Sequence, residues 1–286
     1  AIGQVTVHDY GLISANSSLY DQQGIDNFGT MRSVVRRRGV NGSLIASFIA
    51  SKVFRVHDKK GMYTKNIDRM IFTTEYVKRF FRARGWRGDK GMVIPYAVDL
   101  EGVDKKPQAD DGFILFVGDL HKSKGVHVLL AAARQTGLPI KIIGDGPARN
   151  NLMAQAGAMT NVDFLGALPR KDALDHMRRA RMTVMPSVGL EPFGLVALES
   201  QGVGTPVIVS KIAGLSEVIV HGQTGLLVNP DDVQQLAMAM QRLWDNPQEA
   251  QHMGQLGKRR FESVYSMDRH VGKLMGVYEG LVSESS

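Results

Sequence analysis

The amino-acid sequence predicts an α/β protein with two domains, the second of which is built on a doubly wound parallel sheet. Three observations support this fold class. From residue 112 onward, short apolar runs alternate with helical stretches of about ten residues, the pattern of parallel strands joined by crossover helices. Residues 96–110 form a polar connection before this regular part, so we place the domain boundary at 97/98. The two parts also differ in charge, because residues 1–95 hold 16 Lys and Arg against 7 Asp and Glu, whereas residues 96–286 hold 19 against 21.

The first domain is expected to begin with a strand at residues 2–7. Residues 11–30 are polar and rich in turn-forming residues, which indicates a loop. The remaining expected elements are helices at 31–38, 44–53 and 75–84, and strands at 67–72 and 91–95. Thr73 or Thr74 can cap the third helix, because a hydroxyl before the first turn accepts from an unpaired backbone N–H.

In the second domain, the expected strands lie at residues 113–117, 140–143, 162–165, 182–187, 207–209 and 226–228. The expected helices lie at 126–135, 148–156 and 171–180, then before Gly202, after Pro230, and at 247–264 and 268–282. Pro230 followed by two aspartates is a helix-start signal, because proline suits the first helical position and acidic residues favour the first turn.

The composition excludes several classes of protein. The chain has no Cys, which excludes disulfides and thiolate metal sites and fits a reducing compartment. No apolar run approaches the roughly 20 residues of a membrane-spanning helix. Residues 1–10 lack the basic and apolar regions of a secretory signal. We therefore expect a cytoplasmic protein.

The most informative stretch begins with Glu191-Pro192-Phe193-Gly194-Leu195 and ends at Glu199. It follows the apolar strand at 182–187 and enters a helix. The backbone N–H groups of Phe193, Gly194 and Leu195 would lie at the helix N-terminus, where unpaired donors and the helix dipole favour an anion. One carboxylate stands before the helix and a second lies eight residues later. Together these groups suit a ligand with a diphosphate and hydroxyl groups, such as a nucleotide-sugar.

This stretch resembles retaining glycosyltransferases of family 4, which have the GT-B fold of two Rossmann-like domains. The resemblance is carried by Pro-Ser-x-x-x-Glu-Pro-Phe-Gly, starting at Pro186, and by the Glu-x7-Glu spacing. It continues through residues 204–208, 213–219 and 222–228, and covers about residues 4–280. The resemblance implies that the last helix crosses back to the first domain. The domains would then be residues 1–97 with 265–286, on the acceptor side, and residues 98–264, which bind the nucleotide-sugar.

The resemblance also implies roles for the two glutamates. Glu199 would accept hydrogen bonds from the ribose hydroxyls of the donor, a task that suits a carboxylate with two acceptor oxygens. Glu191 would face the donor sugar as a catalytic group. The sequence leaves open whether Glu191 is a nucleophile or only positions the sugar and stabilises positive charge at C1.

Two further segments resemble donor-binding parts of the family, and a glycine turn is a candidate from its residues alone. Residues 118–125 resemble a Gly-Arg-Leu-x-x-x-Lys-Gly loop that holds the diphosphate; Lys124 matches its lysine, but Asp119 stands in place of its arginine. The negative charge of Asp119 should weaken diphosphate binding, and Lys122 is the candidate for compensation. Gly144, which follows a strand in Gly-Asp-Gly-Pro, permits close approach of the backbone to a ligand, and a structural turn explains this pattern equally well. The main chain near Leu168 corresponds to the segment that contacts the nucleotide base.

On the acceptor side, the resemblance places His8 across the cleft, close to the donor sugar, as a second catalytic residue. It aligns residues 6–9 with a strand midway through the N-terminal domain, which implies a chain truncated or processed at its N-terminus and an incomplete first domain. The other seven histidines have no ligand-like spacing. We therefore expect no metal and no cofactor, with the nucleotide-sugar as donor substrate.

The sequence thus predicts a metal-independent, retaining glycosyltransferase that moves a sugar from a nucleotide-diphospho-sugar to a saccharide or lipid-linked acceptor. The basic clusters at 36–38 and 78–90 suit peripheral contact with an anionic membrane, at its inner face, better than nucleic-acid binding. Two alternatives remain open. Asp119 and the incomplete first domain favour a non-catalytic or partner-dependent nucleotide-sugar-binding fragment, and a sugar-nucleotide epimerase of the same fold is the second.

Overall fold

The computed structural model describes residues 4–7, 20–21, 24–25, 45, 48, 52, 67–83, 91–103 and 109–285 of the 286-residue chain. The chain divides into two compact units. Unit 1 comprises Ala1–Tyr96, Gly189–Phe193 and Asp268–Ser286; unit 2 comprises Ala97–Val188 and Gly194–Met267. The division expected from the sequence did not anticipate that Gly189–Phe193 groups with unit 1.

The described strands of unit 1 form a parallel sheet in the order β1-β4-β5, and a separate antiparallel pair, β2 and β3. Their bounds are Gln4–Val7 for β1, Tyr20–Asp21 for β2, Gly24–Ile25 for β3, Arg69–Phe72 for β4 and Gly91–Val93 for β5. The three parallel strands were expected. The antiparallel pair lies within the stretch that was expected to be a loop. It was not predicted, because strands of two residues are too short to show an apolar pattern.

Two helices with described bounds complete unit 1, α4 at Glu75–Arg82 and α12 at Met267–Ser285. Thr74 caps α4, since its hydroxyl accepts from the N–H of Val77 at 3.2 Å. Buried side chains of α12 pack with Ile71 and Ile94 of the sheet region. Of the expected helix at 44–53, Ile45, Phe48 and Lys52 are described and are helical, whereas the one expected at 31–38 lies outside the described residues.

Unit 2 is built on a parallel sheet whose described strands have the order β11-β10-β9-β6-β7-β8. The strand bounds are Ile114–Val117 for β6, Ile140–Ile143 for β7, Val162–Gly166 for β8, Met182–Met185 for β9, Val207–Ser210 for β10 and Gly225–Val228 for β11. The chain enters at β6, moves to one edge through β7 and β8, and then returns to the other side of β6 with β9.

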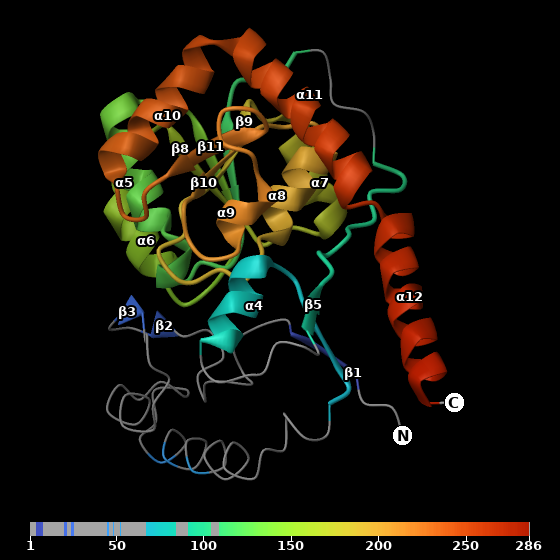
Figure 1. Cartoon of the computed structure of the whole chain (residues 1–286). Coiled ribbons are helices and arrows are strands. Elements are labelled where there is room, and N and C mark those ends of the chain that lie inside the picture. The colour runs from blue at the N-terminus through green and yellow to red at the C-terminus, as the bar shows by residue number, and fades with distance from the viewer. Residues whose placement is uncertain are drawn as a thin grey trace. The chain divides into compact units, whose positions relative to one another are not determined.

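The helices of unit 2 connect and follow these strands. Their bounds are Lys122–Lys124 for the 3₁₀ helix η2, Val126–Thr136 for α5, Arg149–Ala156 for α6, Arg170–Arg179 for α7, Leu195–Gly202 for α8, Leu215–Val218 for α9, Val233–Asp245 for α10 and Pro247–Val264 for α11. Helices α5, α6 and α10 cover one face of the sheet, and α7 and α8 cover the other (Figure 1).

Both faces of the sheet are buried because helices cover each of them. Neighbouring residues of one strand point to opposite faces and therefore enter different clusters. On β6, Phe116 packs in the cluster under α5, α6 and α10, whereas Leu115 packs in the cluster under α7. Every residue of β9 and β10 is buried, as expected for the central strands of a sheet covered on both sides. The doubly wound parallel fold predicted from the sequence is confirmed.

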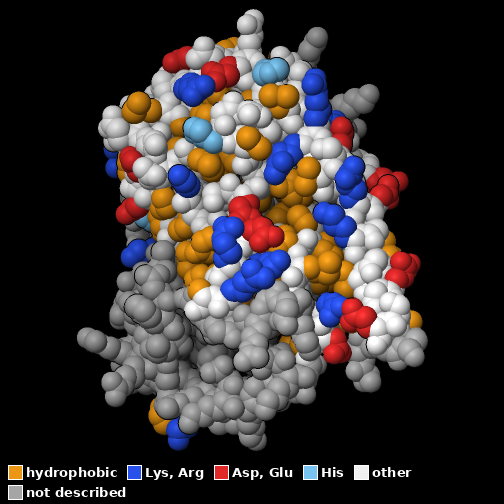
Figure 2. Space-filling model, in the orientation of Figure 1, with side chains coloured by type: hydrophobic (Ala, Val, Ile, Leu, Met, Phe, Trp, Pro, Cys, Tyr) orange, Lys and Arg blue, Asp and Glu red, His pale blue; other side chains and the backbone are white. Residues whose placement is uncertain are grey.

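No helix within the described ranges is long and apolar enough to cross a membrane. On the face drawn in Figure 2, the described Lys and Arg side chains are interspersed with Asp and Glu. Of the basic residues expected to contact a membrane, Lys78, Arg79 and Arg82 lie on α4, while residues 36–38 and 84–90 lie outside the described part of the chain.

Candidate functional site

The strand order of unit 2 indicates where a ligand would bind. In open parallel sheets, ligands bind beyond the carboxyl ends of the strands, at the point where the strand order reverses. Here that point lies between β6 and β9, the first strand of each half of the sheet. The segments that leave β6, β7 and β9 therefore form the candidate site.

The loop after β6 (residues 118–125, the β6 loop) is held in place by the segment after β9. The carbonyl of Ser123 accepts from the N–H of Val188 at 2.8 Å. Gly125 has φ +71°, and a Cβ at this position would lie 1.8 Å from the carbonyl oxygen of Pro186. Only glycine permits this backbone approach without displacing one of the two segments.

The loop after β7 packs against the β6 loop in the same manner. A Cβ on Gly144, which has φ +141°, would lie 1.9 Å from the carbonyl oxygen of Gly118. The N–H of Leu120 donates to the carbonyl of Asp145 at 2.8 Å. The glycine at 144 thus has a structural reason, since it allows the two loops to contact each other; that it also lies against a ligand stays a prediction.

The charged residues of the β6 loop differ in exposure. Lys124 is half-buried at the end of η2, whereas Asp119 and Lys122 are exposed. The ring nitrogen Nδ1 of His121 lies 2.8 Å from the hydroxyl of Ser123 and fixes the turn that leads into η2. Lys124 therefore lies in a segment that hydrogen bonds hold in place next to the switch point.

The N-terminus of α8 lies in unit 2, with Gly194 at the cap position. Gly194 has φ +111°, and no side chain caps this helix end. A Cβ on Gly194 would lie 2.4 Å from Leu215 Cδ1, so a side chain here would crowd α9. The backbone N–H groups of the first turn, starting at the exposed Leu195, are suited to an anion. The helix includes Gly202, one residue beyond the expected end.

Glu199 lies in the second turn of α8, and its side chain is only 16% exposed. Its Oε1 accepts from Nε of Arg170 at 2.9 Å. Burial raises the pKa of the Glu199 carboxyl, and the charge and hydrogen bond of Arg170 oppose that rise. Arg170 also donates from Nη2 to the carbonyl of Asp99 at 3.0 Å. Sequence reasoning missed Arg170; the only signal was its place two residues after Leu168.

Leu168 lies between β8 and α7 and is half-buried. It packs against the cluster that contains Leu115 and Leu174, as does Val196 from the first turn of α8. The segment expected to contact a base and the helix that carries Glu199 therefore pack on the same cluster.

Two predicted site residues group with unit 1. Phe193 is buried, and its ring meets that of Tyr96 edge-on at 5.1 Å between centroids. The carbonyl of Pro192 accepts from the Thr74 hydroxyl at 3.1 Å, and Leu190 packs on the cluster around Phe72 and Phe81. Glu191 is half-buried in this segment. His8 lies outside the described residues.

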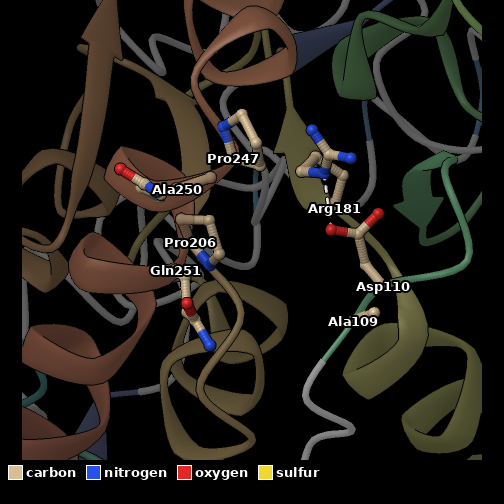
Figure 3. Close-up of a pocket in the computed structure, with 8 residues that line it drawn as sticks. Ala109, Asp110, Arg181, Pro206, Pro247, Ala250 and Gln251 are labelled. Carbon is tan, nitrogen blue, oxygen red and sulfur yellow. Dashed lines mark hydrogen bonds and ion pairs between the residues drawn. The ribbon is translucent and has the colours of Figure 1, made fainter.

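A cavity of about 230 Å³ lies at the amino ends of the unit 2 strands, and Figure 3 shows the residues that line it. It is lined by residues that precede β6, β9 and β10, among them Asp110, Arg181 and Pro206. Arg181 binds Asp110 through Nε at 2.5 Å and the carbonyl of Trp244 through Nη1 at 2.8 Å. Because the guanidinium is already paired and the carboxyl ends of the strands are remote, we assign this cavity a structural role. In the described part of the chain, no group of three His, Asp or Glu residues is placed to hold a metal ion.

Comparison with known proteins identifies the family. Residues 101–260 match the family model described as glycosyl transferases group 1. The chain belongs to this family. It is 33% identical over 223 residues to a D-rhamnosyltransferase of Pseudomonas aeruginosa, covering 71% of this chain and 57% of the relative. It is 32% identical over 210 residues to O-antigen chain mannosyltransferase C of Escherichia coli, covering 69% and 57%. The chain spans little more than half the length of these curated relatives.

Solved structures show the same fold. A sucrose-phosphate synthase of Thermosynechococcus elongatus aligns with a TM-score of 0.76 at 23% identity, covering 98% of this chain and 68% of that one. The Anabaena protein HepE, crystallised with UDP-glucose, aligns with a TM-score of 0.69 at 18% identity, covering 92% and 83%. These similarities confirm the GT-B fold, with its Rossmann-like domains, that the sequence resemblance predicted.

Proposed function

We propose that this chain carries the donor site of a retaining, metal-independent glycosyltransferase of family 4. The donor is a nucleotide-diphospho-sugar, and the acceptor is a saccharide or a lipid-linked saccharide. The observation that carries the proposal is the shielded carboxylate of Glu199, on a helix whose N-terminus no side chain caps, in a unit whose switch point is framed by two interlocked loops. The names of the relatives, a rhamnosyltransferase and a mannosyltransferase, support a sugar donor.

Each predicted site residue has a task in this proposal. The backbone N–H groups at Gly194 and Leu195 and the ammonium of Lys124 stabilise the charge of the departing diphosphate, which needs no metal where fixed donors are in place. Glu199 accepts from the ribose hydroxyls. Phe193 contributes its backbone N–H to the same set of donors, and Gly144 and Leu168 shape the phosphate and base ends of the site.

The reaction breaks the bond between C1 of the sugar and the diphosphate oxygen, which keeps the bonding electrons. The acceptor hydroxyl oxygen forms the new bond to C1 on the same face, and its proton passes to the leaving phosphate or to His8. Glu191 either stabilises the positive charge at C1 or forms a transient covalent bond to it, and both routes give retention.

A thermal-shift panel tests the donor site. UDP-glucose, GDP-mannose and related nucleotide-sugars are added to the chain and to its Glu199→Ala variant. A donor at 100 times its Kd stabilises the folded state by about 2.7 kcal/mol, or roughly 5–10 °C in Tm for a domain of this size. The shift should be lost in Glu199→Ala and kept in Glu262→Ala, which removes an exposed glutamate of α11. A panel in which no nucleotide-sugar raises the Tm would refute the proposal.

A second candidate is a nucleotide-sugar-binding fragment that needs a partner for catalysis. The reason to consider it is the negative charge of Asp119, which is exposed in the β6 loop where the resembled family has an arginine. Incubation with a radiolabelled donor that produces the thermal shift separates the two: release of labelled sugar to water or to a saccharide acceptor indicates a transferase. Binding with no release over hours indicates the partner-dependent fragment.

We further propose that the basic N-terminal part contacts anionic membrane at its inner face, without nucleic-acid binding. The excess of Lys and Arg in residues 1–95 supports this contact. Sedimentation with vesicles that contain anionic lipid should carry the chain down at low salt and release it at high salt. Equal sedimentation with neutral vesicles would contradict it.

A further inference from the structure

The carboxylate of Glu199 has one oxygen engaged and one open. Oε1 accepts from Arg170 Nε at 2.9 Å. Within the described residues, Oε2 has no hydrogen-bond partner, and it is not among the buried polar atoms that lack one, so solvent reaches it. A carboxylate held in this manner presents two lone pairs of Oε2 in a fixed direction.

Arg170 is held at both ends of its guanidinium. It is the first residue of α7, and Nη2 donates to the carbonyl of Asp99 at 3.0 Å while Nε donates to Glu199. The carboxylate of Asp99 in turn accepts from the N–H of Glu101 at 2.8 Å, which fixes the turn that presents its carbonyl. Three segments of unit 2, at residues 97–103, α7 and α8, therefore meet at one side chain.

This arrangement differs from an ordinary surface ion pair. An exposed ion pair contributes little to stability and holds neither partner in a single geometry. Here the acid is 16% exposed, although the arginine is 55% exposed, and the planar guanidinium is anchored at a second point. The bridge therefore restricts the rotation of the carboxylate as well as offsetting its charge.

We propose that Arg170 is a positioning residue of the nucleotide site, which orients Glu199 so that Oε2 is presented to the ribose hydroxyls of a nucleoside diphosphate. This inference rests on the proposed function, because it takes Glu199 as the ribose-binding group. Arg170 itself contacts no part of the ligand in this scheme. Its effect on binding therefore passes through the hydroxyls that Glu199 binds.

The test compares ligands with and without those hydroxyls. Calorimetry measures Kd for UDP and 2′,3′-dideoxy-UDP, and for GDP and 2′,3′-dideoxy-GDP, with the wild-type chain and with Arg170→Gln. For the base that binds, Arg170→Gln should weaken the ribonucleotide about tenfold, because the charge-supported hydrogen bonds lose their geometry. It should change the Kd of the dideoxynucleotide less than about twofold.

Two further variants separate positioning from charge and from folding. Lys171→Gln removes the neighbouring exposed cation of α7 and should leave both Kd values unchanged. Arg170→Lys keeps the charge but loses the two-point bridge, so it should restore only part of the ribonucleotide affinity. The Tm of each variant is measured in the absence of ligand to verify the fold.

The possible outcomes are distinct. Equal weakening of both ligands by Arg170→Gln, no weakening, or tighter UDP or GDP binding would each overturn the inference; tighter binding would mean that Arg170 competes with the ribose. Wild-type binding that is the same with and without the hydroxyls would overturn the assignment of Glu199 to the ribose. If the wild-type chain binds neither UDP nor GDP and no nucleotide-sugar raises its Tm, the proposed function fails, and the role of Arg170 fails with it.

Discussion

Replacement of Gly125 by alanine tests the interlocking of the two segments at the switch point. The new Cβ would lie 1.8 Å from the carbonyl oxygen of Pro186, so it must retreat by about 1.2 Å to reach even 3.0 Å. The contacted atom is backbone and cannot rotate away. The residue must also keep φ at +71°, which costs a residue other than glycine about 1–2 kcal/mol.

The magnitude follows from three contributions. The backbone strain adds about 1–2 kcal/mol, forced separation of packed segments adds about 1–3 kcal/mol, and loss of the hydrogen bond from Val188 to Ser123 adds about 1 kcal/mol. We therefore expect Gly125→Ala to lower the free energy of unfolding by about 3–6 kcal/mol and the Tm by about 10 °C. Donor binding should weaken as well, because the β6 loop carries Lys124.

Gly137→Ala is the matched control. Gly137 ends the same helix that Gly125 begins, has φ +67°, and has open space where its Cβ would stand. This variant carries the backbone strain without the collision and should lose only about 1–2 kcal/mol. Thermal unfolding and urea titration of both variants give the difference. If Gly125→Ala is no less stable than Gly137→Ala, the close approach does not limit this position, and the interlocked geometry is wrong.

Two further predictions concern pH and a buried hydroxyl. Burial lowers the pKa of His127, so the native state binds this proton less tightly than the unfolded chain, whose value is near 6.5. Stability should therefore fall as the pH drops from 7 through 6.5, and urea midpoints between pH 5 and 7 should vary less in His127→Gln. The hydroxyl of Ser200, fully buried, lies 2.9 Å from that of Thr183 and 3.0 Å from the carbonyl oxygen of Thr205. Ser200→Ala removes both contacts and should cost about 1–3 kcal/mol in urea unfolding.

Each of these has an outcome that contradicts it. An equally steep loss of stability below pH 7 in His127→Gln would assign the pH dependence to another group. For the buried hydroxyl, Ser263→Ala on the exposed side of α11 is the comparison and should change the free energy of unfolding by less than about 0.5 kcal/mol. Equal effects of the two serine variants would show that the Ser200 hydroxyl contributes nothing to stability.

The sheet of unit 2 was predictable because its strands are buried on both faces. Such strands have nearly continuous apolar runs, and the observed Ile114–Val117 and Met182–Met185 lie within the expected 113–117 and 182–187. The four-residue helix α9 was not expected, since one turn has too few residues to show a helical period. The sequence predicted that Gly125 and Gly144 lie in loops. It did not show why these positions require glycine, because each packs against backbone that is far away in the sequence.

The candidate site was predictable where one continuous segment builds it. The glycine before α8 and the glutamate in its second turn follow from local pattern alone. Arg170 could not be inferred in this way, because its partner lies 29 residues away and the pairing depends on α7 and α8 covering the same face. The grouping of Gly189–Phe193 with unit 1 was missed for a similar reason: Leu190 and Phe193 find their apolar contacts on residues 67–96.

That five-residue segment has a consequence for building chimeras between members of this family. Exchanging residues 97–267 as one continuous cassette would also replace Leu190, Pro192 and Phe193, whose contacts are with Thr74, Tyr96 and the Phe72 cluster. A foreign cassette would bring side chains shaped for a different partner and leave this hydrophobic cluster uncovered. The portable part is therefore two stretches, Ala97–Val188 and Gly194–Met267, with the native Gly189–Phe193 spliced between them.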